Sequence, residues 1–141
     1  MSYAERMKIT VEQSIKADLA AVWNAWNTPA DIIKWNAASD DWHTTGSTVD
    51  LREGGTFSAR MEAKDGSAGF DFEGTYTRVV PQKALDYRLS DGREVQVEFT
   101  DQPGGVLVRE TFDAETENPP EMQRAGWQAI LDNFKRYVES T

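Results

Sequence analysis

Cysteine is absent from this chain of 141 residues, and histidine occurs once, at His43. Without cysteine there is no disulfide framework, no thiolate nucleophile and no cysteine-ligated zinc or iron–sulfur site. A single histidine also excludes a histidine-rich metal site and a relay between two histidines. Asp40 and Asp41 lie close to His43, but such a short run does not by itself make a metal site. We therefore expect neither a metal nor a cofactor.

Basic side chains and long apolar stretches are also scarce. Lysine and arginine total 15 against 24 aspartates and glutamates, which gives a formal net charge of −9. Nucleic acids and anionic membrane surfaces both require clustered basic side chains, so we expect neither as a partner. No apolar run approaches the roughly 20 residues of a spanning helix. Met1 to Lys8 lacks the apolar core and cleavage site of a signal peptide, and we expect a soluble, cytoplasmic protein.

Aromatic residues, by contrast, are plentiful. Five tryptophans, four tyrosines and six phenylalanines make up 11% of the chain. With 39% hydrophobic and 28% charged residues, the composition is that of a globular protein. A chain of this length buries roughly 70% of its unfolded surface, and no repeat, low-complexity tract or linker interrupts it. We predict one domain over residues 1–141.

The first third of the chain predicts one strand and two short helices. Polar and apolar residues alternate from Lys8 to Lys16, which is typical of a half-buried strand. Asp18 is a candidate N-cap for the first helix, and Thr28-Pro29 marks the start of the second. We expect residues 36–45, which are polar and irregular, to form a long loop that carries Trp42 and the sole histidine.

The rest of the chain predicts hairpin-connected strands and then one long helix. From Thr48 to about Asp113 apolar residues alternate with polar ones, and Asp65-Gly66 and Asp91-Gly92 are strong hairpin turns. From about Glu121 to Val138 the apolar residues follow the helical spacing i, i+3, i+4, i+7 and i+11.

The order of these elements predicts an α+β fold. One sheet of about seven strands has one apolar face to bury, and only one long apolar helix is available to cover it. A curved antiparallel sheet wrapped around the C-terminal helix satisfies both. Gly74 within a strand, and Gly54-Gly55 at a strand entry, are points where the sheet could bend.

This arrangement leaves part of the concave face to be filled. Seven strands at about 4.8 Å spacing span on the order of 30 Å, whereas a helix is about 10 to 12 Å across. Either large side chains pack the remaining space as ordinary core, or an apolar cavity remains, the usual form of a small-molecule site. The predicted inner rows contain Phe57, Phe70, Phe72, Tyr76, Tyr87, Phe99 and Phe112.

Two residues bear on this choice. Gly126 interrupts the long helix at a cost of roughly 1 kcal/mol relative to alanine, either for close packing against the sheet or to leave room for a ligand. Glu110 takes an inward position between Val108 and Phe112. Such a carboxylate is expected to be paired, protonated or facing a wet cavity, unless a bulge rotates it to solvent. Gln13 and Arg78 are further candidates for polar cavity groups, and Arg78 could pair with Glu110.

Four sequence strings are similar to a known superfamily. They are Val22-Trp23-Asn24-Ala25-Trp26, Asp50-Leu51-Arg52-Glu53-Gly54-Gly55, Phe72-Glu73-Gly74-Thr75-Tyr76 and Ala125-Gly126-Trp127-Gln128-Ala129-Ile130-Leu131. In this order, over Ile9 to Val138, they resemble the SRPBCC or START-like superfamily. The resemblance is to its bacterial branch similar to the C-terminal domain of the activator of the heat-shock protein 90 ATPase. It implies the helix-grip fold with a hydrophobic cavity between sheet and helix.

The resemblance leaves the function open, because the superfamily includes carriers, polyketide cyclases, hormone-binding proteins and co-chaperones. The eukaryotic activators resemble two-domain proteins, and only the C-terminal type of domain is present here. We favour binding of a small hydrophobic or aromatic molecule, such as a lipid-, flavonoid- or polyketide-like compound. The alternatives are a polyketide cyclase or dehydratase that moves protons with Glu110, Tyr76 or Tyr87, and a co-chaperone in the stress response.

His43 lacks a neighbouring nucleophile and is assigned to the surface or rim, so no catalytic residue is named. The protein is expected to be a monomer or homodimer. We expect the tryptophans to join the open end of the sheet to its helices and to rim the entrance. The predicted ligand-binding residues are Trp35, Phe57, Met61, Phe70, Phe72, Tyr76, Tyr87, Val97, Phe99, Glu110, Trp127, Ile130 and Leu131.

Overall fold

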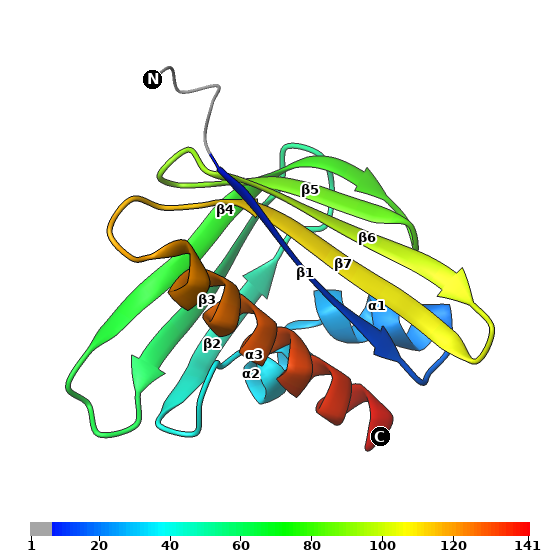
Figure 1. Ribbon diagram of the computed structural model, residues 1–141, viewed down its shortest axis with the longest axis horizontal. Coiled ribbons are helices and arrows are strands. Elements are labelled where there is room, and N and C mark those ends of the chain that lie inside the picture. The colour runs from blue at the N-terminus through cyan, green and yellow to red at the C-terminus, as the bar shows by residue number, and fades with distance from the viewer. Residues whose placement is uncertain (1–6) are drawn as a thin grey trace.

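A computed structural model describes residues 7–141 (Figure 1). Its seven strands form one antiparallel sheet in the order β1-β7-β6-β5-β4-β3-β2. The sheet curves around the long C-terminal helix α3, which confirms the predicted α+β helix-grip fold. The elements are β1 (Lys8–Ile15), α1 (Leu19–Asn27), α2 (Pro29–Trp35), β2 (Trp42–Val49), β3 (Thr56–Ala63), β4 (Gly69–Val80), β5 (Ala84–Leu89), β6 (Glu94–Gln102), β7 (Gly105–Asp113) and α3 (Pro120–Glu139).

The helix starts follow the local chemistry that the sequence predicts, with one difference. The Asp18 carboxylate accepts a hydrogen bond from the Ala21 N–H at 2.7 Å and caps α1. Thr28 occupies the N-cap position of α2 and Pro29 follows it, but the Thr28 hydroxyl donates back to the Asn24 carbonyl instead. α2 therefore begins without a side-chain cap.

The predicted loop over residues 36–45 is shorter than expected, because β2 already begins at Trp42. Trp42 and His43 pair with Ala63 and Glu62 of β3. β2 is the edge strand of the sheet, where one face and one side meet solvent, so its polar composition hides the strand from pattern reading. The assignment of Trp42 and His43 to a loop was wrong for this reason.

The curvature of the sheet involves two register irregularities and one docked turn. The ladders shift between Thr44 and Gly46 on β2 and between Tyr76 and Arg78 on β4, and such bulges bend a strand. The turn before β3 is fixed to β4. The Gly54 N–H donates to the Tyr76 carbonyl at 2.8 Å, and the Tyr76 N–H donates to the Gly55 carbonyl at 2.9 Å. Gly54 has a φ of 83°, which favours glycine there.

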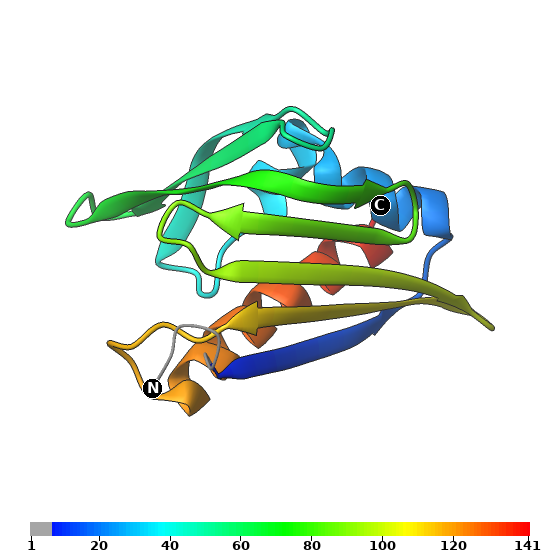
Figure 2. The same ribbon diagram turned by 90° about the horizontal axis from the view of Figure 1, so that it is seen from above.

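The helices cover the concave face unevenly (Figures 1 and 2). α3 packs against β1, α2 packs against β2, and α1 contacts β6 and β7. The Phe134 ring lies 4.9 Å from that of Trp26 and 4.8 Å from that of Trp35. Phe134 is fully buried, as is Val22, so the end of the fold beside α1 is solidly packed.

Two expectations concern the chain's relation to membranes and export. None of the helices within residues 7–141 is long and apolar enough to span a membrane. The expectation that no signal peptide is present concerns Met1 to Lys8, of which residues 1–6 lie outside the described part of the chain.

Candidate functional site

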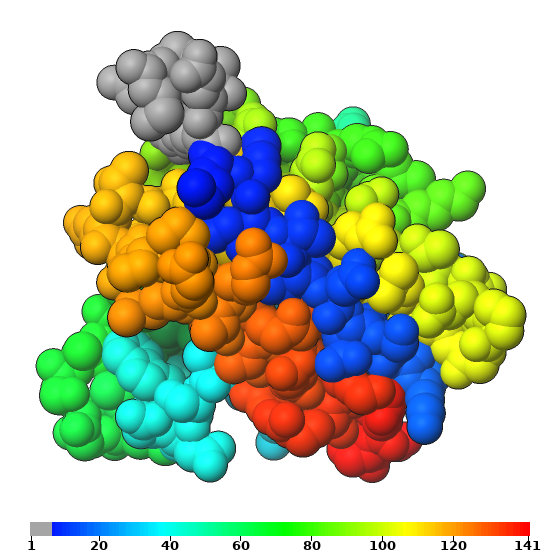
Figure 3. All heavy atoms as spheres, in the orientation of Figure 1, coloured from blue at the N-terminus to red at the C-terminus, as the bar shows by residue number. Residues whose placement is uncertain are grey.

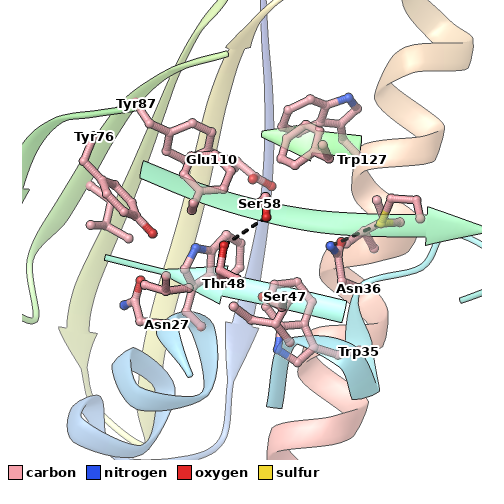
Figure 4. Close-up of a pocket in the computed structure, with 18 of the residues that line it drawn as sticks. Asn27, Trp35, Asn36, Ser47, Thr48, Ser58, Tyr76, Tyr87, Glu110 and Trp127 are labelled. Atoms are coloured by element: carbon pink, nitrogen blue, oxygen red, sulfur yellow. Dashed lines mark hydrogen bonds between the residues drawn. The ribbon is translucent and has the colours of Figure 1, made fainter. Parts of the chain in front are cut away.

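A cavity of about 290 Å³ lies between the helices and strands β2 to β5 (Figure 4). In the space-filling view the surface is hollowed between the first half of α3, the cyan β2 region and the green strands β3 and β4 (Figure 3). Of the predicted ligand-binding residues, the structure brings together on the cavity wall Trp35, Phe57, Met61, Phe70, Phe72, Tyr76, Tyr87, Glu110, Trp127 and Ile130.

Three predicted residues do not line the cavity. Val97 and Leu131 are fully buried in the packed core, and Phe99 is 4% exposed. The Phe99 ring lies 5.2 Å from the ring of Trp23 and 5.9 Å from that of Trp26. The tryptophans of α1 therefore fill the space next to this part of the sheet, so that inward residues there become ordinary core.

At the end of the concave face away from α1, the aromatic residues lie in different environments. Phe70 is 49% exposed at the open edge, and its ring lies 5.8 Å from that of Trp42. Phe112 does not reach the cavity, because the Trp127 ring stacks on it at 3.9 Å with an angle of 9° between the planes. Trp127 also meets the Phe72 ring at 6.2 Å. This side chain of α3 thus joins β7 to β4 and forms one wall.

Glu110 points inward on β7, as the alternation predicts. Its ladders with β1 and β6 continue without a shift, so the alternative of a bulge that turns it to solvent is wrong. The residue is 6% exposed and makes no hydrogen bond or ion pair within residues 7–141. Burial raises the pKa of its carboxyl group from 4.5 to about 8. At neutral pH Glu110 is therefore mainly protonated and able to donate a hydrogen bond into the cavity.

Arg78 and Gln13, which were predicted as polar groups of the cavity, do not line it. A bulge separates Tyr76 from Arg78 and changes the phase of β4, so Arg78 faces outward and pairs with Asp86 at 3.8 Å. Gln13 donates to the Asp132 carboxylate at 3.0 Å. This contact ties β1 to α3 outside the cavity wall.

Tyr76 and Tyr87 also line the cavity, and Tyr87 is the one that lies near Glu110 (Figure 4). Burial, with the nearby charge of Asp50, raises the pKa of Tyr76 to about 12. Burial and the neighbouring Glu110 raise the pKa of Tyr87 well above its ordinary value. Both phenols therefore stay protonated at neutral pH. Together with Glu110 they give an aromatic cavity a small set of polar groups that can fix the orientation of one ligand.

Sequence reasoning missed several wall residues, most of them polar. Arg93 follows a hairpin turn and shares the inward alternation of Val95 and Val97, a signal that could have identified it. Its Nε donates to the Asp91 carboxylate at 2.8 Å. The missed residues are Trp26, Asn27, Ile32, Asn36, Ser47, Thr48, Val49, Ser58, Leu85 and Arg93.

Ser47 and Thr48 of β2 lie outside the loop predicted for residues 36–45. They were missed because polar side chains on an edge strand give no apolar alternation to read. The Thr48 and Ser58 hydroxyl groups lie 2.9 Å apart, and the Asn36 amide donates to the Met61 sulfur at 3.5 Å (Figure 4). These contacts satisfy polar groups of the wall within the protein. The part of the cavity wall that these residues form is therefore mildly polar but uncharged.

The structure also bears on the roles predicted for His43 and Gly126. His43 is half-buried on β2 and is not part of the cavity wall. Within residues 7–141 no group of three or more His, Asp or Glu side chains is arranged to hold a metal ion, so Asp40, Asp41 and His43 do not gather into one. A Cβ atom added at Gly126 would meet nothing within 4 Å. The interpretation that Gly126 permits close packing against the sheet is therefore wrong.

Comparisons with known proteins agree with this fold and with the resemblance noted in the sequence. The family model described as "Activator of Hsp90 ATPase homolog 1-like protein" matches residues 16–139. An AHSA1-like protein from Aeromonas hydrophila is 61% identical, with a TM-score of 0.90 over 95% of this chain and 93% of that chain. A protein from Cytophaga hutchinsonii is 47% identical, with a TM-score of 0.82 over 94% and 92% of the two chains.

A protein from Chromobacterium violaceum has the same fold at 21% identity, with a TM-score of 0.84 over 94% of this chain and 98% of that chain. A comparison with curated proteins finds no match.

Proposed function

The chain belongs to the activator of Hsp90 ATPase homolog 1-like family of the SRPBCC superfamily, and we propose that its cavity binds one small hydrophobic or aromatic molecule. The observation that carries this proposal is the hollow itself: a space of about 290 Å³ lined mainly by aromatic side chains. An apolar cavity of that size leaves van der Waals contacts unmade, and a ligand that fills it regains them.

The volume limits the size of the ligand. Ligand pockets in proteins span roughly 300 to 1,000 Å³, and an engineered apolar cavity of about 150 Å³ accepts benzene. A space of 290 Å³ therefore suits a compound of one or two rings better than a sterol or a long-chain lipid. Among the classes considered, a compact aromatic compound fits better than a lipid.

Binding is favoured over catalysis by the composition of the wall. Cysteine is absent from the chain, and the sole histidine does not reach the cavity. The groups able to move protons are Glu110, Tyr76 and Tyr87, all of which are mainly protonated at neutral pH. In the empty cavity these groups are therefore set mainly to donate hydrogen bonds to a bound molecule, which favours binding over proton abstraction.

The test is a calorimetric titration of the protein with a panel of one- and two-ring aromatic compounds. We expect saturable binding at one site, and chemical-shift changes in amide NMR spectra at wall residues such as Phe57 and Trp127. Ile130→Trp should fill the cavity and abolish binding, whereas Ile33→Trp, the same change on the exposed side of α2, should leave it intact. Binding that survives Ile130→Trp would place the ligand elsewhere.

The family description favours a second candidate, a chaperone cofactor in the stress response. This role is distinguished by a rise in the ATPase rate of purified Hsp90 when the protein is added. An increase that is unchanged in Ile130→Trp would separate this role from the cavity. No change in the ATPase rate would leave ligand binding as the function.

A further inference from the structure

We propose that Glu110 makes the cavity selective for an organic cation: an aromatic body of one or two rings that carries a protonated amine. This inference rests on the proposed function and narrows it to one class of ligand. It depends on where Glu110 points, on which charged groups face it, and on the rings around it.

The carboxyl group of Glu110 is aimed into the cavity from β7, the strand next to the edge strand β1 (Figure 4). Its register partners are Val11 on β1 and Val97 on β6, and neither can bond to it. The side chain is 6% exposed and has no hydrogen bond or ion pair within residues 7–141. Buried carboxylates are normally paired, so this one has a vacant place for a partner on the cavity side.

The described residues around the cavity do not supply that partner. On the sheet, the titratable side chains of the wall besides Glu110 are Tyr76 on β4, Tyr87 on β5 and Arg93 before β6. Arg93 is already engaged with Asp91. The three helices contribute only aromatic, aliphatic and amide side chains to the wall. A positive charge is therefore the element that this part of the structure lacks and that a ligand can bring.

The aromatic rings that share the cavity wall with Glu110 suit a cation. The Phe57 ring lies 5.2 Å from that of Tyr76 and 4.8 Å from that of Tyr87, which forms a cluster at one end of the cavity. Ring faces carry negative electrostatic potential and attract ammonium groups. The net charge of −9 acts in the same direction, because it attracts cations and repels anions during approach. A carboxylate ligand would meet Glu110 with no compensating free cation.

Proton exchange distinguishes an amine from a neutral ligand. In the empty cavity Glu110 holds its proton up to a pH of about 8. An ammonium group requires the ionised carboxylate, so its binding releases that proton and strengthens as the pH rises toward 8. A neutral hydrogen-bond acceptor instead uses the proton of Glu110, and its binding weakens above that pH. The two classes of ligand therefore have opposite pH dependences.

The experiment compares three compounds that share one ring system: 2-(2-naphthyl)ethylamine, 2-(2-naphthyl)ethanol and 2-naphthylacetic acid. Titration calorimetry is carried out at pH 6, 7 and 8, in buffers with different ionisation enthalpies so that released protons are counted. We expect the amine to bind at least tenfold more tightly than the alcohol at pH 8. Its affinity should rise nearly tenfold between pH 6 and 7, with release of close to one proton. The acid should bind most weakly.

Two variants locate the effect. Glu110→Gln should keep affinity for the alcohol and lose both the preference for the amine and the proton release. Asp86→Asn, which removes a half-buried carboxylate on β5 that is paired with Arg78, should bind all three compounds as the wild type does. If Glu110→Gln fails to fold, the pH dependence of the three compounds in the wild-type protein decides the question alone.

The outcomes separate the two proposals. Equal or tighter binding of the alcohol, or amine binding that does not change with pH, overturns the selectivity for cations and leaves cavity binding standing. Amine preference retained in Glu110→Gln has the same consequence. Absence of binding by all three compounds and by the wider panel overturns the proposed function and this inference together.

Discussion

The two ends of the concave face differ in how their inward side chains are used. Beside α1, the rings of Trp23, Trp26 and Phe134 meet those of their neighbours, and no room remains. Beside β3 and β4, Phe57 and Phe72 face open space. Both ends obey the same alternation of polar and apolar residues. The two ends differ in whether a helix places a bulky side chain against that part of the sheet. The alternation of residues along the strands does not reveal where such a side chain packs.

The largest expected effect comes from truncating an aromatic ring in each end. Phe134→Ala should lower the free energy of unfolding by about 4 kcal/mol, because Phe134 is fully buried between tryptophan rings. Phe72→Ala should cost about 1 kcal/mol, because this half-buried ring already borders a cavity and loses fewer contacts. Urea denaturation measures both values. Equal losses would mean that the two ends are packed alike.

A smaller effect, of opposite sign, is expected at Glu110. Its pKa lies at about 8 in the folded protein against an ordinary value of 4.5, so the folded state binds the proton more tightly than the unfolded chain does. The contribution of Glu110 to stability is thus most favourable below pH 4.5, falls as the pH rises to about 8, and is level above that. Glu110→Gln removes this loss and should stabilise the protein by about 3 kcal/mol at pH 7.

The measurement for Glu110 is a series of denaturation curves between pH 4.5 and 8.5 on wild type and variant. The difference in stability between them should be small at the acidic end and should grow with pH. Glu98→Gln changes an exposed glutamate on the neighbouring strand and serves as the matched control. A difference that does not depend on pH would show that Glu110 is solvated or paired in solution.

The smallest effect concerns two glycines on elements that border the cavity, Gly126 on α3 and Gly74 on β4. Gly126→Ala should raise the free energy of unfolding by roughly 1 kcal/mol, because alanine favours the helix and its Cβ meets nothing within 4 Å. Gly74→Ala should instead destabilise the protein, since its Cβ would come within 2.5 Å of the Arg88 carbonyl oxygen. Thermal unfolding of both variants checks the contrast, and a destabilised Gly126→Ala would reveal a contact at that position.

Most of the fold follows from the sequence because alternation and helical spacing are local signals. The predicted start of β2 lies after the observed one at Trp42, because an edge strand tolerates polar residues such as Thr44 and Thr45. Arg78 was misplaced because a one-residue bulge reverses the facing of every residue after it. Alternation places Val97 and Tyr87 alike on the inner face, yet one is core and the other lines a cavity. That distinction depends on tertiary packing, which sequence pattern does not contain.

The position of β1 has a consequence for folding kinetics. This first strand completes the sheet by pairing with β7, so that Lys8 meets Asp113 across 105 residues of chain. Such a pairing forms only after a long loop has closed, which slows folding relative to hairpin-connected strands. Until β1 docks, the β7 edge and the apolar side chains beneath it stay uncovered. We therefore expect the joining of the first and last strands to be the late step of folding, and β7 to be the segment through which folding intermediates aggregate.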